Sequence, residues 1–235
     1  MRLLLFSNST NPGEGFLDHG NEEIRKFLGK KPGRILFIPY AAVTMSYDVY
    51  SDKVKEKFKK LGYTIDSIHL SENPAQSVKE SDCIIVGGGN TFHLLQQIQK
   101  NNLTKPIANR VKSGASYIGW SAGANLACPT IRTTNDMPII ETENLKAFNL
   151  VPFQINPHYT DKTIEGHGGE SREVRIEEFL KLNQQKFVIG LREGSALKIE
   201  SQSITLLGKS SARLFKYGTP ASELTVKDDF NFLLP

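Results

Sequence analysis

The sequence predicts an α/β fold in which a mostly parallel sheet is flanked by helices on both faces. Short apolar runs alternate along the chain with longer amphipathic segments, a pattern typical of strands joined by crossover helices. Runs such as Cys83–Val86 are apolar at every position, which indicates strands buried on both faces of a sheet. A length of 235 residues suits one large domain, so we expect residues 1–235 to form a single domain.

The first half of the chain carries five predicted strands, most of them followed by a helical pattern. Helical periodicity covers His19–Leu28 and Asp52–Leu61, and further helices are expected from Thr91 and after Ser121. The predicted strands are Leu3–Phe6, Arg34–Pro39, Tyr63–His69, Cys83–Val86 and Tyr117–Gly119.

The second half of the chain is less regular. Its predicted elements are a polar, proline-containing excursion over Thr130–Asn144, a strand at Phe153–Asn156, a glycine-rich loop at Gly166–Gly169 and a helix at Glu173–Leu182. Three further strands are expected to form an antiparallel extension of the sheet. These strands are Lys186–Leu191, Ala196–Glu200 and Ser203–Leu207.

The charge of the chain argues against a nucleic-acid partner. The formal net charge of +4 is mild, and no dense stripe of Lys and Arg is present. The lysine-rich segment Lys53–Lys60 carries Val54 and Phe58 four residues apart, which indicates the solvated face of an amphipathic helix. Aromatic residues do not alternate with these lysines, so we expect no nucleic-acid binding. The small positive excess is compatible with acidic substrates.

Cysteine usage and apolar runs indicate the compartment. Cys83 and Cys128 both sit beside apolar or small residues, which predicts core packing and not a disulfide framework. No apolar run approaches the length that crosses a membrane, and the first residues show no cationic leader with a cleavage site. We therefore expect a cytoplasmic protein with no membrane partner.

A candidate nucleophile lies at the end of the fifth predicted strand. Gly119, Ser121 and Gly123 form a G-x-S-x-G pattern between this strand and a helix of small residues, the context of a nucleophile elbow. The turn is sharp, and the two glycines keep it free of side chains. The Ser121 hydroxyl then points into the crevice above the sheet, and the Ala122 amide faces developing negative charge. The alternative is a glycine-rich turn with an incidental serine.

A serine nucleophile needs a base, and His158 is the candidate among the five histidines. It follows the predicted strand Phe153–Asn156, so we expect it at the same edge of the sheet as Ser121, where ligands of α/β folds bind. Two carboxylates are candidates to orient it. Glu193 is preferred because it also ends a predicted strand, whereas Asp136, in a turn, would give the Ser-acid-His order of α/β-hydrolases.

A glycine run after the fourth predicted strand supplies candidate backbone donors. Gly87, Gly88 and Gly89 let amides approach a ligand closely, and no Gly-Lys-Ser/Thr follows to make a phosphate-binding loop. We expect Gly88 or Gly89 to form an oxyanion hole with Ala122. We also expect Asn90, directly after the glycines, to contact the substrate. The alternative is a simple tight turn.

These segments together resemble one family, the peptidase E or alpha-aspartyl dipeptidase family of serine peptidases. The resemblance runs over nearly the whole chain and is more specific than the serine pattern alone. The segments that carry it are Gly87–Asn90, Gly119–Asn125, Thr133–Pro138, Gln154–Tyr159 and Gly168–Arg175.

The resemblance implies a flavodoxin-like fold similar to class I glutamine amidotransferases, with a Ser-His-Glu triad. Ser121, His158 and Glu193 take those roles, and Asp136 matches a family aspartate that has also been treated as catalytic. The family cleaves Asp-Xaa dipeptides without a metal or a cofactor, so a small peptide is the expected substrate. Selecting an aspartate side chain requires a cation, and Arg172 is the candidate because arginine suits a carboxylate bidentately.

Several alternatives stay open from the sequence. One is a cyanophycinase-like peptidase that acts on aspartate–arginine polymers, and another is an amidotransferase-like hydrolase with serine in place of cysteine. A third is a non-catalytic binding module of the same fold. The sequence also leaves open whether the protein is a monomer or a homodimer, and whether Arg172 pairs with Glu170 or Glu173 instead of a ligand.

Overall fold

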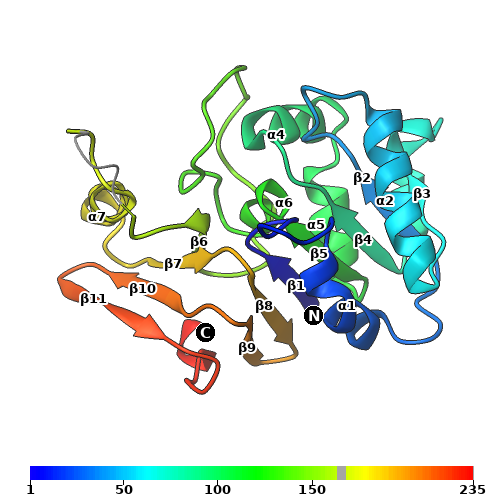
Figure 1. Ribbon diagram of the computed structural model, residues 1–235. Coiled ribbons are helices and arrows are strands. Elements are labelled where there is room, and N and C mark those ends of the chain that lie inside the picture. The colour runs from blue at the N-terminus through cyan, green and yellow to red at the C-terminus, as the bar shows by residue number, and fades with distance from the viewer. Residues whose placement is uncertain (163–167, 235) are drawn as a thin grey trace.

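The computed structural model describes residues 1–162 and 168–234, which form two β-sheets flanked by helices (Figure 1). The strands of the larger sheet are β1 (Arg2–Phe6), β2 (Ile35–Ile38), β3 (Asp66–Ser67), β4 (Cys83–Val86), β5 (Ser116–Trp120), β8 (Ser195–Glu200) and β9 (Ser203–Gly208). Their order across the sheet is β3-β2-β4-β5-β1-β8-β9. The strands from β3 to β1 run parallel, whereas β8 and β9 are antiparallel to their neighbours. The predicted α/β class is confirmed.

Helices cover both faces of the larger sheet. They are α1 (Asn21–Leu28), α2 (Tyr47–Leu61), α3 (Pro74–Glu80), α4 (Thr91–Lys100), α5 (Thr104–Lys112) and α6 (Ala122–Leu126), with 3-10 turns at Asp18–Gly20, Ile68–Leu70 and Asn231–Leu233. Successive side chains of a strand point to opposite faces of the sheet. Leu3 and Leu5 of β1 therefore pack with residues of α3 to α6, whereas Leu4 and Phe6 pack with residues of α1 and α2.

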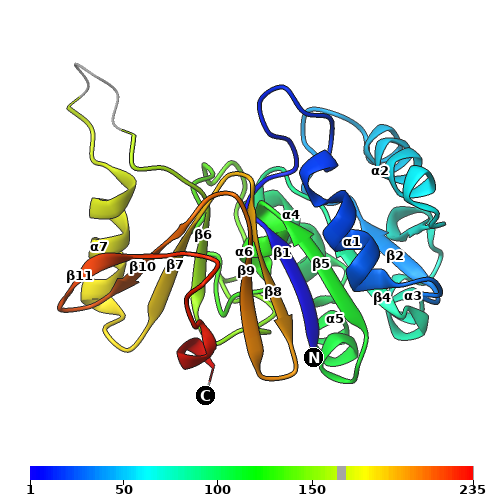
Figure 2. The same cartoon turned by 60° about the horizontal axis from the view of Figure 1, so that its bottom comes forward.

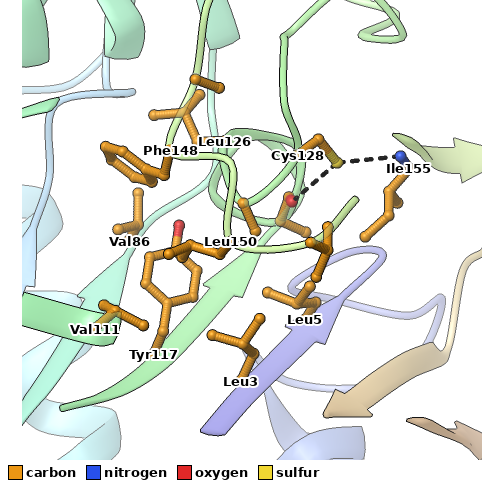
Figure 3. Close-up of a cluster of buried hydrophobic side chains, with 14 of the residues drawn as sticks. Leu3, Leu5, Val86, Val111, Tyr117, Leu126, Cys128, Phe148, Leu150 and Ile155 are labelled. Carbon is orange, nitrogen blue, oxygen red and sulfur yellow. Dashed lines mark hydrogen bonds between the residues drawn. The ribbon is translucent and has the colours of Figure 1, made fainter. Parts of the chain in front are cut away.

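The larger of these two apolar clusters includes a buried cysteine. Figure 3 shows side chains of β1, β4 and β5 beside Phe148 and Leu150, which come from the segment after α6. The sulfur of Cys128 accepts a hydrogen bond from the Ile155 amide at 3.2 Å (Figure 3). Burial raises the pKa of the Cys83 and Cys128 thiols to about 12. Both cysteines are free and buried, so the predicted packing role is confirmed.

A second, smaller sheet is formed by four strands from the C-terminal half of the chain. Its strands are β6 (Gln154–Tyr159), β7 (Phe187–Arg192), β10 (Ala212–Lys216) and β11 (Thr219–Leu224), in the order β11-β10-β7-β6. The helix α7 (Arg172–Leu182) packs on this sheet through Ile176 and Leu180 (Figure 2). Ile155 and Ile189 of the smaller sheet belong to the same apolar cluster as Leu3. One continuous core therefore joins the two sheets.

Two strand predictions differ from the structure. The strand β7 does not extend the larger sheet, because it pairs in parallel with β6 and in antiparallel register with β10; β8 and β9 alone form the extension. Two strands separated by a short Glu-Gly turn are typical of a hairpin, but here each finds its partners in a different sheet. The predicted strand Tyr63–His69 shortens to Asp66–Ser67, because His69 folds back onto the Ser67 hydroxyl at 2.8 Å.

Two further sequence predictions concern the loop before α7 and the membrane. The predicted loop Gly166–Gly169 begins inside residues 163–167, which lie outside the described residues. Within residues 1–162 and 168–234, none of the helices combines the length and the apolar character needed to cross a bilayer.

Candidate active site

Ser121 lies in the turn between β5 and α6, at the carboxyl end of the parallel strands. It adopts φ 53° and ψ −115°, a conformation that residues with side chains rarely adopt. Its amide donates to the Phe6 carbonyl at 3.1 Å, which ties the turn to the end of β1. A sharp strand-to-helix turn of this kind presents a nucleophile above the sheet.

Close packing behind this turn explains the glycine at position 123. A Cβ atom added to Gly123 would overlap the carbonyl oxygen of Val86 in β4. The helix α6 therefore approaches β4 more closely than a larger residue allows. The close packing of α6 against β4 therefore fixes the turn that carries Ser121.

His158 contacts both Ser121 and Glu193. Its Nε2 lies 2.9 Å from the Ser121 Oγ, and its Nδ1 lies 2.7 Å from the Glu193 Oε1. A carboxylate at Nδ1 favours the tautomer that carries its proton there, which leaves Nε2 able to accept the serine proton. The three side chains therefore have the nucleophile, base and orienter geometry of acyl transfer.

An irregularity in β6 presents this histidine. The pairing of β6 with β7 shifts register between Pro157 and Tyr159, and His158 between them takes φ 53°. A bulge re-aims the side chain that it carries. Here the bulge lets an imidazole from the smaller sheet reach a serine of the larger sheet.

Glu193, and not Asp136, is the carboxylate in contact with the imidazole. Glu193 lies in the turn where the chain passes from β7 to β8. Asp136 instead accepts two hydrogen bonds from Thr91, from the amide at 2.7 Å and from the hydroxyl at 2.5 Å. Thr91 opens α4, and a carboxylate is favourable beside the unpaired amides of a first helical turn. The geometry gives the orienting position to Glu193, and the catalytic roles of both carboxylates stay predictions.

Backbone amides without a protein acceptor lie near Ser121. Across residues 1–162 and 168–234, no acceptor is found for the amides of Gly88, Gly89 and Ala122. A Cβ atom on Gly88 would lie 2.9 Å from the Ser121 Cβ, so the glycine lets its loop pass beside the nucleophile. The Tyr50 hydroxyl fixes this loop by donating to the Gly88 carbonyl at 3.0 Å. These amides are free of protein acceptors in the described residues, and their role as oxyanion donors stays a prediction.

A cavity of about 810 Å³ opens at Ser121 and His158 and contains side chains of both signs of charge. Arg172 and Asp136 line it, together with Glu193. Arg172 is half-buried, and burial, followed by the nearby Arg175, lowers the pKa of its guanidinium. The cavity thus offers a partly desolvated cation near the nucleophile.

The ion pairs that the sequence offers as an alternative for Arg172 are not formed. In the part of the chain that the structure describes, no carboxylate lies within ion-pairing distance of its guanidinium, Glu170 and Glu173 included. Glu173 lies instead 3.6 Å from Arg213. Arg172 opens α7, where a cation is electrostatically unfavourable, and its contact with a ligand carboxylate stays a prediction.

Comparison with known proteins decides the family. The model of peptidase family S51 matches residues 3–207. A protein named peptidase E from Nostoc sp. is 52% identical over 233 residues, which cover 99% of this chain and 96% of the relative. The chain belongs to peptidase family S51. A peptidase E from Salmonella arizonae is 47% identical over 224 residues, 95% of this chain and 97% of the relative.

Solved structures show the same fold as this S51 peptidase. A peptidase from an acI-B1 Actinobacterium has a TM-score of 0.73 at 21% identity and covers 97% of this chain and 96% of its own. A protein from Listeria monocytogenes EGD-e has a TM-score of 0.65 at 24% identity and covers 89% and 98%. Family membership makes this chain a serine peptidase, so the alternative of a non-catalytic binding module is set aside.

Asn90 has a structural role in this S51 peptidase. Its Oδ1 accepts from the His93 amide at 3.0 Å and caps α4, and its Nδ2 donates to the Met137 carbonyl at 3.0 Å. The two bonds tie the start of α4 to the segment that carries Asp136. Asn90 also lines a second cavity beside Ser121, and its contact with substrate stays a prediction.

Two residues at the end of β1 support the S51 site and were not among the predicted site residues. The Ser7 hydroxyl accepts from the His158 amide at 2.9 Å. The Asn8 Oδ1 accepts from the Gly194 amide, next to Glu193, at 2.9 Å. A signal was available in the sequence, because a polar pair directly after an apolar strand lies at the edge where α/β folds bind ligands.

Proposed function

We propose that this S51 peptidase hydrolyses Asp-Xaa dipeptides after the N-terminal aspartate, through an acyl-enzyme on Ser121. One observation carries the proposal. The hydrogen-bonded series from Ser121 through His158 to Glu193 opens on a cavity that holds Arg172, an arginine without a carboxylate partner in the described residues. The resemblance to peptidase E in sequence, shared by relatives of that name, agrees with it.

The mechanism is acyl transfer in two steps. The Ser121 Oγ attacks the aspartyl carbonyl carbon while the His158 Nε2 accepts the hydroxyl proton, and Glu193 stabilises the imidazolium. The carbonyl oxygen becomes an oxyanion that accepts hydrogen bonds from the amides of Gly88, Gly89 and Ala122. His158 then protonates the leaving amine as the C–N bond breaks. Water attacks the ester with His158 as base, and free aspartate leaves.

The charges of the larger cavity match those of an N-terminal aspartate. Such a residue brings a side-chain carboxylate and an α-ammonium into one small space. Arg172 offers a bidentate partner for the carboxylate. Asp136, whose second oxygen is not used by Thr91, offers a partner for the ammonium. Desolvation of both ligand charges is costly unless protein charges replace the water.

A substrate panel tests the reaction. Purified protein is expected to cleave Asp-Leu, to cleave Glu-Leu and Ala-Leu poorly, and to leave N-acetyl-Asp-Leu intact because acetylation removes the ammonium. Ser121→Ala is expected to fold normally and to lose about 10⁴-fold in kcat, since members of a triad act as a unit. Substantial residual turnover in this variant would remove Ser121 as the nucleophile. Cleavage of an aspartate–arginine polymer but not of Asp-Leu would favour the cyanophycinase-like alternative.

The role of Arg172 is tested by removing its charge. Arg172→Met is expected to raise the barrier for Asp-Leu by roughly 2–5 kcal/mol, as for a buried charge that loses its partner, and to affect Ala-Leu much less. Lys181→Met is the matched control, because Lys181 is exposed on the same helix and does not line the cavity. Comparing kcat/KM for the two substrates isolates the side-chain contribution. An unchanged preference for aspartate in Arg172→Met would show that another group binds the carboxylate.

We also propose a cytoplasmic location for the enzyme. Its two cysteines are buried and free, as suits a reducing compartment. Recovery of the protein with a periplasmic or extracellular marker in cell fractionation would contradict this location.

A further inference from the structure

Ser121 and His158 lie between two cavities. The larger, about 810 Å³, contains Arg172 and Asp136, and the smaller, about 480 Å³, lies on the side of Lys53. Ser121 and His158 line both cavities. A serine peptidase holds the acyl half of its substrate on one side of the nucleophile and the leaving half on the other. If the larger cavity takes the aspartyl half, the smaller one faces the leaving residue.

Apolar side chains from three loops converge on the smaller cavity. Phe16 comes from the loop after β1, Val43 and Met45 come from the loop between β2 and α2, and Ile139 comes from the long segment before β6. Val43, Met45 and Ile139 are 52%, 42% and 53% exposed. Large apolar side chains that gather at a cavity and stay open to solvent indicate a surface for an apolar ligand group.

Lys53 supplies positive charge to the same cavity. Among the described residues it is the one lysine or arginine that lines it. Its Nζ lies 4.5 Å from the centroid of the Phe16 ring, a cation–π contact that holds the ammonium at the cavity wall. Lys57 and Lys60 of the same helix pair with carboxylates, whereas no carboxylate in residues 1–162 and 168–234 lies within ion-pairing distance of Lys53.

We propose that the smaller cavity is the subsite for the leaving residue, in which Lys53 binds the free C-terminal carboxylate and the apolar rim contacts the side chain. This inference rests on the proposed function. In a dipeptide the leaving amino acid carries its carboxylate one carbon from the scissile nitrogen, whereas in a longer peptide that position is a neutral amide. A cation in this cavity therefore selects dipeptides over longer chains. The apolar rim selects leucine-like over small leaving residues.

The charge contribution is tested with two substrates that differ only at the C-terminus, Asp-Leu and Asp-Leu-amide. Wild type is expected to prefer Asp-Leu by about fivefold in kcat/KM, since Lys53 is exposed and an exposed ion pair contributes modestly. Lys53→Met is expected to lose this preference through a fall in kcat/KM for Asp-Leu, and Lys53→Arg is expected to retain it. The preference of wild type should also weaken at high salt.

Lys59→Met is the matched control, because Lys59 is exposed on the same helix and does not line the cavity. It is expected to behave as wild type with both substrates. The rim is tested with Val43→Ser, which is expected to lower kcat/KM for Asp-Leu about threefold to tenfold and to lower kcat/KM for Asp-Gly much less, because glycine brings no side chain to the rim.

The outcomes separate this inference from the proposed function. Wild-type protein that cleaves Asp-Leu, together with a Lys53→Met variant that keeps the full preference for Asp-Leu over its amide, would overturn the subsite and leave the function standing. Wild-type protein that cleaves no Asp-Xaa substrate would overturn the function, and the subsite with it. Loss of the preference for Asp-Leu over its amide in Lys53→Met, but not in Lys59→Met, would support both the subsite and the proposed function.

Discussion

Ser7 connects β1 to three other strands. Its hydroxyl accepts from the His158 amide at 2.9 Å and donates to the Leu191 carbonyl at 2.7 Å, while its amide donates to the Ser195 carbonyl at 3.0 Å. These bonds meet at the point where His158 leaves regular strand geometry. Ser7 is therefore a positioning residue for the imidazole, although it touches no reacting atom.

Ser7→Ala removes this hydroxyl and is expected to lower kcat about tenfold while KM stays nearly unchanged. The reason is that the amide of His158 loses its hydrogen-bond acceptor, whereas the binding cavities stay intact. Ser81→Ala is the control, since its hydroxyl is also buried and donates to the Val78 carbonyl at 2.8 Å away from both cavities. Each variant is expected to lose about 1–3 kcal/mol in the free energy of unfolding. Steady-state kinetics and urea unfolding measure the two effects. Equal loss of kcat in Ser81→Ala would argue against positioning.

Candidate site residues were predictable from the sequence where their position after an apolar strand was enough to identify them. Ser121, His158 and Glu193 each follow an apolar run, which marks them as candidates by the strand-end rule. The expectation that they share one edge of one sheet is wrong, because Ser121 follows β5 of the larger sheet and His158 lies within β6 of the smaller sheet. The role of Ser7 depends on a contact with His158, 151 residues away. No local pattern encodes that partner.

Arg192 holds the end of β7 next to the orienting Glu193. It contacts Glu223 of β11 with two nitrogens, at 2.8 and 2.9 Å, and Asp161 after β6 at 2.6 and 2.9 Å. The hydrogen bond from Arg192 is the main cause that lowers the pKa of the Glu223 carboxyl to about 2. The network therefore ties three segments together beside the candidate triad.

Glu223→Gln is expected to lower the free energy of unfolding by about 1 kcal/mol at neutral pH, a modest value because the pair is partly exposed. The pKa of Glu223 is depressed from 4.5 in the unfolded chain, so its contribution is present above pH 4.5 and is lost as the pH falls toward about 2. The difference between variant and wild type should shrink over that range in urea unfolding. Glu177→Gln, at an exposed site on α7, is the control. A difference that does not change with pH would contradict the ion-pair explanation.

Elements were predictable where the apolar pattern was strong. The parallel strands β1, β2, β4 and β5 are buried along most of their length, and their apolar runs indicate this directly. The strands β10 and β11 were not predicted, because β11 is an edge strand with no buried residue and carries Pro220. Proline is tolerated at such an edge but weakens any strand signal.

The whole molecule is held by a core that crosses between the sheets. Leu3 and Leu5 of the larger sheet share one apolar cluster with Ile155 and Ile189 of the smaller sheet. The arrangement into two sheets was not predictable, because the turn at Glu193 gives no sign that the chain changes sheet there. A single domain over residues 1–235 stays a prediction.

Such a shared core predicts one cooperative unfolding transition. Trp120 is the only tryptophan of the sequence and lies buried at the end of β5, so its fluorescence reports on the larger sheet. Far-UV circular dichroism reports on the secondary structure of both sheets. The two signals are expected to share one midpoint in urea. Separate midpoints would show that the sheets unfold as two units.

The positive φ at Ser121 has a consequence for the choice of residue at this position. A serine held in that conformation costs the fold about 1–3 kcal/mol, which a glycine at the same position would largely relieve. Mutation and drift under selection for stability alone would therefore favour glycine there. A serine at this position is therefore explained by the nucleophile that it supplies and not by a gain in stability.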